Sequence, residues 1–169
     1  ALLAREKPAR DGAEPSGNAV AAMNLLRIAE LRSDDAARRR AERVLAAFAA
    51  PLRNGEPMYA MLSALDFALD RPLEVVLVAP AAGAAAALED VQRRIFVPSA
   101  VRVLAVEGED LAGQARLVPL LEGKRALGGR PTAFVCRGRS CDLPTSDPKV
   151  FAAQLERIEP LFPAPPRAP

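Results

Sequence analysis

The sequence predicts an α+β fold: helical hairpins, followed by a small, three-layer-like α/β subdomain with a short, partly parallel sheet. Three observations predict it. Apolar residues recur at helical spacing up to about residue 70, runs rich in Val and Leu follow it, and half of the 169 residues are hydrophobic while 26% are charged. We therefore expect a helical region at 1–71, an α/β subdomain at 72–159 and a Pro-rich tail at 160–169.

The first two helices are expected at 19–32 and 35–50. The apolar stripe of the first helix is Ala22, Leu25, Leu26 and Ala29, and that of the second is Ala41, Val44, Leu45 and Phe48. Ser33, Asp34 and Asp35 are candidates for the N-cap of the second helix. The pair is similar to one tetratricopeptide-type unit, but a solenoid needs several such repeats.

A third helix is expected after Asn54-Gly55, with Pro57 in its first turn. Its apolar stripe is Met58, Met61, Leu62, Leu65 and Leu69. These residues follow the 3.6-residue period, so the whole first region is predicted to be helical.

The pattern changes after Pro72. Strands are expected at 73–79 and 101–106, and a helix within 82–96 joins them. This spacing predicts a right-handed βαβ unit with parallel, neighbouring strands. A third strand is expected at 132–136 and a last helix at 151–158, while 117–121 fits either a short helix or a turn. The five prolines of 160–169 predict a disordered tail.

Composition excludes several classes of function. The net charge of +2 and the single Tyr, with no Trp, give no footprint for binding nucleic acid. The absence of His removes His-based triads and His metal sites. We expect no membrane span, no signal peptide and, from only two cysteines, a cytoplasmic setting. Because the sequence starts without Met, we expect a processed chain or a fragment of a longer protein.

A turn-rich polar segment at 11–18 precedes the first helix. Its polar side chains are the carboxylates of Asp11 and Glu14, the hydroxyl of Ser16 and the amide of Asn18. These groups can hydrogen-bond a polyhydroxylated ligand, and the two carboxylates can share acid and base roles. The alternative is structural: Ser16 or Asn18 caps the helix, and the helix dipole favours the acidic groups.

Four stretches of the sequence resemble a known family. They are DGAEPSGNAVAA at 11–22, RPLEVVLVAP at 71–80, LLEGK at 120–124 and PTAFVCRGRSC at 131–141. They resemble segments of the thioredoxin-domain proteins of the spermatogenesis-associated family and their bacterial relatives. Ala19 stands where that family usually has Ser, and Gly138-Arg139 replaces a more common Asn-aromatic pair.

The resemblance implies a C-terminal part of such a protein. Members carry a thioredoxin-like domain and a six-hairpin (α/α) toroid, which is similar to N-acylglucosamine 2-epimerases and six-hairpin glycosidases. Region 1–71 would then end the toroid, and Asp11, Glu14, Ser16 and Asn18 would face its cavity and a carbohydrate-like ligand. We expect an accessory module that is inactive alone. The alternatives are a protein-interaction module and a thiol redox element.

The two cysteines, Cys136 and Cys141, follow a C-x4-C spacing rather than the C-x-x-C of thioredoxin-like redox sites. We expect a reduced pair near a loop, with a reversible disulfide as the alternative. Zinc would need four N or S ligands, and the chain has only two Cys and no His, so no metal is expected. No cofactor is expected either, because 79–83 and Gly123-Lys124 lack the glycine pattern of a nucleotide-binding loop.

Overall fold

The computed structural model describes residues 7–70, 72–108, 111–138 and 140–157. Within them the chain is a mixed α+β protein, as predicted, and it has seven α-helices, one 3₁₀ helix and a four-stranded sheet. It divides into two compact units, Ala1–Leu69 and Asp70–Pro169. The predicted tail at 160–169 lies outside the described residues. No helix in the described ranges has the length and apolar character needed to cross a membrane.

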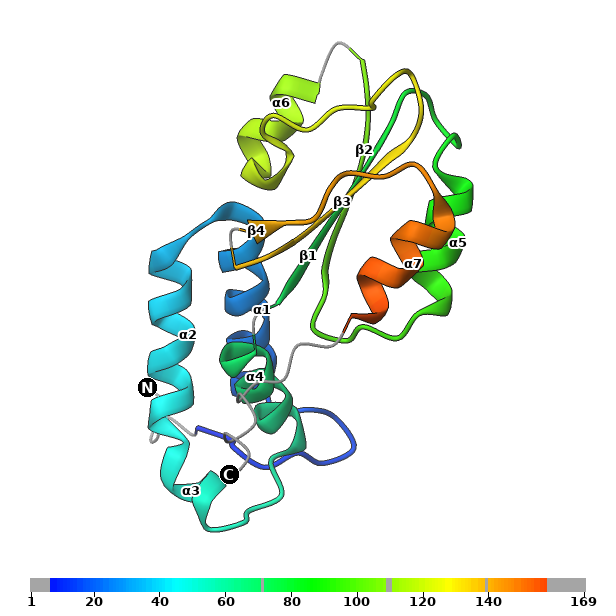
Figure 1. Cartoon of the computed structure of the whole chain (residues 1–169). Helices are drawn as coiled ribbons and strands as arrows, with labels where there is room; N and C mark the ends of the chain where they lie inside the picture. The colour runs from blue at the N-terminus through cyan, green and yellow to red at the C-terminus, as the bar shows by residue number, and fades with distance from the viewer. Residues whose placement is uncertain (1–6, 71, 109–110, 139, 158–169) are drawn as a thin grey trace, which may run out of the picture. The chain divides into compact units, whose positions relative to one another are not determined.

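Helices α1 (Gly17–Arg32) and α2 (Asp35–Ala47) form a hairpin in the first unit (Figure 1). Ser33 makes the tight connection with a left-handed backbone, φ 51°, and its N–H donates to the carbonyls of Ala29 and Glu30. Asp34 is the N-cap of α2, because its carboxylate accepts the N–H groups of Ala36 and Ala37. Of the three predicted cap candidates, the structure therefore selects Asp34.

The predicted helix at 35–50 is wrong at its C-terminal end. Helix α2 stops at Ala47, and a separate short helix, α3 (Ala49–Arg53), follows Phe48. Pro51 explains the break, since it has no N–H to donate and its ring would clash with the carbonyl of Ala47 in a continuous helix.

Helix α4 begins at Tyr59 and ends at Leu69. Pro57 was expected in the first turn of this helix, but it lies two residues before the helix begins. Helices α1, α2 and α4 pack against one another. The fully buried side chains between them are mostly small or flexible: Ala22, Leu26, Ala41, Met58, Met61 and Ala64. Small side chains on these faces let the helix backbones approach closely.

The sheet of the second unit has the strand order β2-β1-β3-β4. Strands β1 (Leu73–Ala79) and β2 (Val101–Val106) are parallel neighbours joined through α5 (Ala86–Arg94), which confirms the predicted βαβ unit. Strand β3 (Thr132–Arg137) pairs antiparallel with β1, and the unpredicted β4 (Ser140–Cys141) pairs antiparallel with β3. Gly138, with φ 55°, supplies the positive φ at the start of the tight β3–β4 turn.

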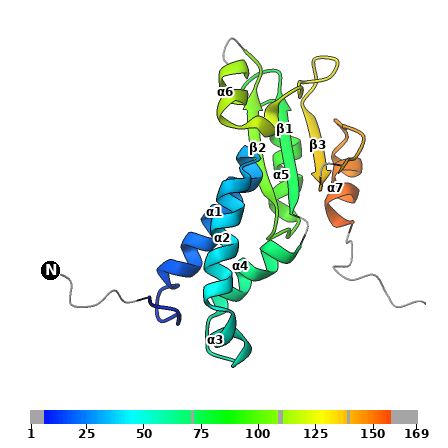
Figure 2. The same ribbon diagram turned by 90° about the vertical axis from the view of Figure 1, so that its left-hand side faces the viewer.

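Helices α5 and α7 (Pro148–Glu156) cover one face of the sheet (Figures 1 and 2). The core on this face contains alternating strand residues and helix residues, namely Leu73, Val75, Leu77, Leu88, Ala133, Val135, Phe151 and Leu155. On the other face lie α6 (Leu111–Leu117) and the 3₁₀ helix η1 (Pro119–Leu121), which contact β2 and β1. The segment 117–121 is therefore mostly helical.

Helix α7 begins at Pro148, three residues before the predicted start. Asp147 is its N-cap, with a carboxylate oxygen 2.8 Å from the N–H of Lys149, and Pro148 occupies the first turn. This Asp-Pro pair is a local start signal for a helix, and the apolar stripe alone did not reveal it.

Candidate functional site

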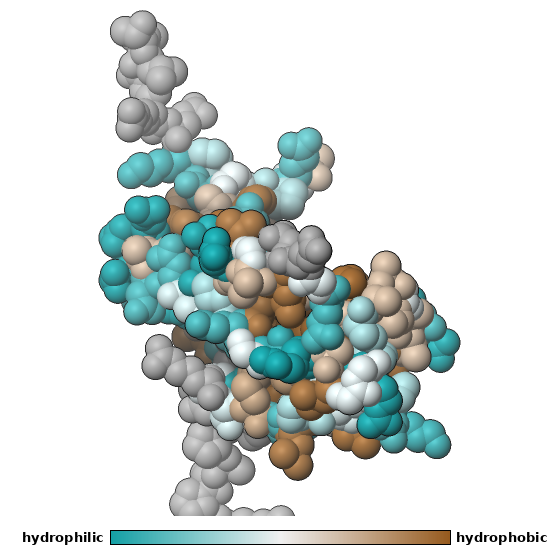
Figure 3. All heavy atoms as spheres, turned by 90° about the horizontal axis from the view of Figure 1, so that it is seen from above, coloured by the Kyte–Doolittle hydropathy of each residue, from teal (hydrophilic) through white to brown (hydrophobic). Residues whose placement is uncertain are grey.

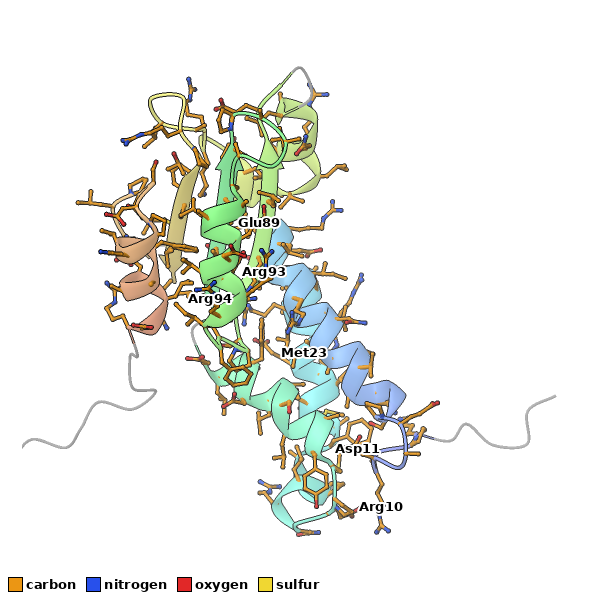
Figure 4. All side chains as sticks on the ribbon, turned by 90° about the vertical axis from the view of Figure 1, so that its right-hand side faces the viewer. Arg10, Asp11, Met23, Glu89, Arg93 and Arg94 are labelled. Carbon is orange, nitrogen blue, oxygen red and sulfur yellow. A yellow bond between two sulfur atoms is a disulfide. The ribbon has the colours of Figure 1, made fainter. Side chains whose placement is uncertain are left out.

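Asp11 fastens the polar segment to helix α4. Its Oδ1 accepts the N–H of Ser16 at 2.9 Å, and its Oδ2 accepts the N–H of Ala60 at 2.8 Å. Both bonds favour the ionised carboxylate, so the amides of Ala60 and Ser16 lower the pKa of Asp11 below its ordinary value. The loop and the first turn of α4 are thus held by one carboxylate, which Figure 4 labels.

Ser16 is the N-cap of α1, which confirms one of the two predicted caps. Its Oγ accepts the N–H of Ala19 at 3.2 Å, and the residue is 5% exposed. Asn18 has a different role: its Nδ2 donates to the carbonyl of Pro8 at 2.8 Å, which anchors the chain that enters the loop.

Glu14 is the candidate whose side chain stays open. It is exposed, and its carboxylate makes no hydrogen bond or ion pair to the described part of the chain. Asp11, Ser16 and Asn18 satisfy backbone groups instead. The structure brings the four candidates into one loop, and ligand binding by them remains a prediction.

Cys136 and Cys141 form a disulfide, so the expected reduced pair is wrong for this structure. The β3–β4 pairing is the reason, because it places the two residues directly opposite each other. Cys136 is 3% exposed at the end of β3, whereas Cys141 is exposed on the edge strand. The hairpin turn that creates β4 was not predicted, whereas a disulfide between these two cysteines was the alternative that the sequence left open.

Glu74 is a functional candidate that the sequence analysis missed. It interrupts the apolar run of β1 and lies directly opposite Cys136 in the β1–β3 pairing. Burial raises the pKa of Glu74 above its ordinary value, and the nearby Lys124 ammonium opposes that shift only in part. A charged residue inside a buried strand was the available signal.

A cavity of about 800 Å³ lies beside α6 and η1, near the carboxyl end of β2. Its charged lining includes Glu107, whose Oε1 accepts the N–H of Ala126 at 2.7 Å, and Lys124, whose Nζ donates to the carbonyl of Leu120 at 2.6 Å. These groups stabilise the loops that form the cavity.

On the molecular face in Figure 3, polar and apolar side chains are interspersed.

In the described ranges, no three His, Cys, Asp or Glu residues lie close enough together to hold a metal ion. The side chains that the structure does bring together therefore form two candidate sites: the Asp11 loop in the first unit, and Glu74 with the disulfide in the second.

Comparisons with known proteins give one set of relatives. The chain is 30% identical over 149 residues to Spermatogenesis-associated protein 20 of Homo sapiens and of Rattus norvegicus, and 29% identical to that of Mus musculus. Each match covers 87% of this chain and 19% of the relative, so the chain spans about a fifth of the length of these curated proteins. No protein-family model matches the chain, and no solved structure gives a significant match.

Proposed function

We propose that this chain is a structural, accessory module of a longer thioredoxin-domain protein similar to Spermatogenesis-associated protein 20. It would be inactive alone and would complete a toroid that binds a carbohydrate-like small molecule, with epimerase- or glycosidase-like chemistry in the parent protein. The match of 149 residues, most of this chain but 19% of the relative, supports a role as a part of a larger protein.

The observation that carries the proposal is the bonding of the polar loop. Both carboxylate oxygens of Asp11 and the hydroxyl oxygen of Ser16 accept hydrogen bonds from backbone N–H groups. Such bonds fix the shape of a loop and the start of two helices, which is the work of a structural module. Glu14 is left exposed as the one loop carboxylate available to a ligand in the parent protein.

Helix α1 supports the same proposal. Ala22 and Leu26 on one side are fully buried, while Val20 and Ile28 elsewhere on the helix are 44% and 41% exposed. A helix that is apolar on several sides suits a position between neighbouring helices. In the parent protein, further toroid helices would cover Val20 and Ile28. The alternative, a protein-interaction module, would use the same residues against a separate protein.

The test begins with the gene on both sides of these 169 codons, followed by expression of the encoded protein. Titration with N-acetylglucosamine and N-acetylmannosamine, followed by calorimetry, should detect saturable binding in the longer protein and none in the 169-residue chain. Glu14→Gln should weaken that binding, whereas Asp66→Asn, at an exposed position on α4, should not.

Three results would contradict the proposal. They are a gene that encodes only these residues, epimerase or glycosidase turnover by the chain alone, and unchanged sugar binding in the Glu14→Gln parent.

A second candidate function rests on the disulfide. We propose that Cys136 and Cys141 form a reversible thiol redox element in a cytoplasmic protein. In that compartment disulfides are usually transient, catalytic or redox-sensing rather than structural. Alkylation in denaturant followed by mass spectrometry should find no free thiol after exposure to oxidised glutathione and two after reduction. Two free thiols under both conditions would contradict this function.

A further inference from the structure

Three side chains form one row across the sheet of the second unit. The strand registers pair Glu74 with Cys136, and Cys136 with Cys141. Directly opposite residues on neighbouring strands point to the same face, with Cβ atoms about 4.5–5.5 Å apart. Val75 and Val135, one position along each strand, belong to the core under α5 and α7. Glu74 and both cysteines therefore share the opposite face.

The two sulfur atoms differ in access. Cys136 is 3% exposed, whereas Cys141 is exposed on the edge strand β4. Thiol–disulfide exchange proceeds by attack of a thiolate on one sulfur of the disulfide, so its outcome depends on which sulfur the thiolate can reach. An external thiolate reaches Cys141, and Cys136 is then the leaving sulfur.

The backbone around Cys141 is held independently of the disulfide. The N–H of Asp142 donates to the carbonyl of Val135 at 2.9 Å, and the Asp142 carboxylate accepts a bond of 2.8 Å from Arg157. When the sulfur–sulfur bond is broken, the first contact still holds this segment beside β3, and the second holds it to the end of α7. The two thiols stay close together and can form the disulfide again.

Glu74 is the ionisable neighbour of the leaving sulfur. The described groups that face it are Cys136 from β3, Val101 from β2 and Lys124 from the segment after η1. Burial raises the pKa of its carboxyl, and the ammonium of Lys124 reduces the shift without reversing it. Glu74 therefore keeps its proton to a higher pH than an ordinary glutamate does.

We propose that the Cys136–Cys141 disulfide is an exchange site for an external dithiol, with Cys141 as the attacked sulfur and Glu74 as the proton donor to Cys136. This inference rests on the second proposed function and adds to it the class of reductant, the direction of attack and the source of the proton.

In the first step, a thiolate of the dithiol bonds to Sγ of Cys141, the bond between Cys141 and Cys136 breaks, and its electron pair goes to Cys136, which takes the Glu74 proton. The second thiol of the reductant, as a thiolate, then attacks the mixed disulfide and releases Cys141 as a thiolate, which is protonated by water. The protein disulfide gains two electrons, and the dithiol is oxidised to a disulfide.

The experiment measures the reduction rate of the full chain by dithiothreitol, with acid quenching, alkylation and mass spectrometry. Glu74→Gln keeps the shape of the side chain but has no proton to give. We expect it to slow reduction about tenfold or more at acidic pH. The difference from the wild type should shrink as pH rises, because an ionised Glu74 donates no proton. Glu42→Gln, at an exposed position on α2, is the matched control and should reduce at the wild-type rate.

Single-cysteine variants test the direction of attack. Cys141 in Cys136→Ser should react with a maleimide at least about tenfold faster than Cys136 in Cys141→Ser, because reactivity follows access. Equal or reversed rates would overturn the assignment of the attacked sulfur. A Glu74→Gln chain that matches the wild type at every pH would overturn the proton role and leave the redox element intact. A chain that forms no disulfide under oxidised glutathione would overturn both.

Discussion

Asp11, in the loop before α1, and Glu74, in β1, both carry a carboxylate, and their surroundings shift the two pKa values in opposite directions. Asp11 accepts two backbone N–H groups, from Ser16 and Ala60, and its pKa is lowered. Glu74 faces a neighbouring cysteine, and burial raises its pKa. A carboxylate that receives amide N–H groups stabilises structure as an anion. One that is buried without them keeps its proton to a higher pH than an exposed carboxylate does.

The largest effect is expected for Asp11→Asn. Asn offers one acceptor oxygen in place of two, so the N–H of either Ser16 or Ala60 loses its partner, and the loop separates from α4. The urea midpoint should fall, and amide hydrogen exchange at Ser16 and Ala60 should become faster. Asp66→Asn, an exposed change on α4, is the control and should leave both measurements unchanged. Unchanged exchange at Ala60 would show that the Asp11 carboxylate does not bond to this N–H group.

Ser16→Ala should have the next largest effect. It removes the Oγ that accepts the N–H of Ala19, and loss of such a cap costs roughly 0.5–2 kcal/mol of unfolding free energy. Urea unfolding followed by circular dichroism measures this change. Ser16→Asp retains an acceptor and should recover most of the loss. An equal loss in both variants would contradict the capping role.

The pH dependence should have opposite signs at the two carboxylates. A lowered folded pKa means that the stability contributed by Asp11 is present above its unfolded pKa of about 3.9 and is lost as pH falls through the lower folded value. The deficit of Asp11→Asn should therefore vanish in acid.

For Glu74 the folded pKa is raised, so its contribution is present at low pH and is lost as pH rises through that folded value. Glu74→Gln should slightly stabilise the chain at neutral pH and make little difference in acid. Urea midpoints at several pH values measure both trends. A neutral-pH loss of stability in Glu74→Gln would reverse the comparison.

Glu14→Gln should have the smallest effect on stability, within about 0.5 kcal/mol, because the side chain is exposed. The measurement is the urea midpoint against that of Asp11→Asn. A loss as large as that of Asp11→Asn would show that Glu14 helps to fix the loop in the way that Asp11 does. The loop would then have no open carboxylate for a ligand.

Sequence reasoning worked best where one segment carries its own signal. The stripe that contains Leu26 predicted α1, and the Val-rich runs at 73–79 and 101–106 predicted the parallel pair. It failed where a local feature overrode the stripe. Pro51 ended α2 early, and the two-residue turn at Gly138 created a strand too short to show an alternating pattern.

The sequence by itself determined the helical hairpin, the βαβ unit and a cap of α1 at Ser16 or Asn18, because periodicity and capping act between residues a few positions apart. Only the tertiary structure decided the partners of the polar groups. Asp11 meets the N–H of Ala60, 49 residues away, and Glu74 meets Cys136 through the register of two strands that are distant in the chain. Such pairings depend on how whole elements pack and on which register buries the apolar face, and no local pattern of residues encodes that choice.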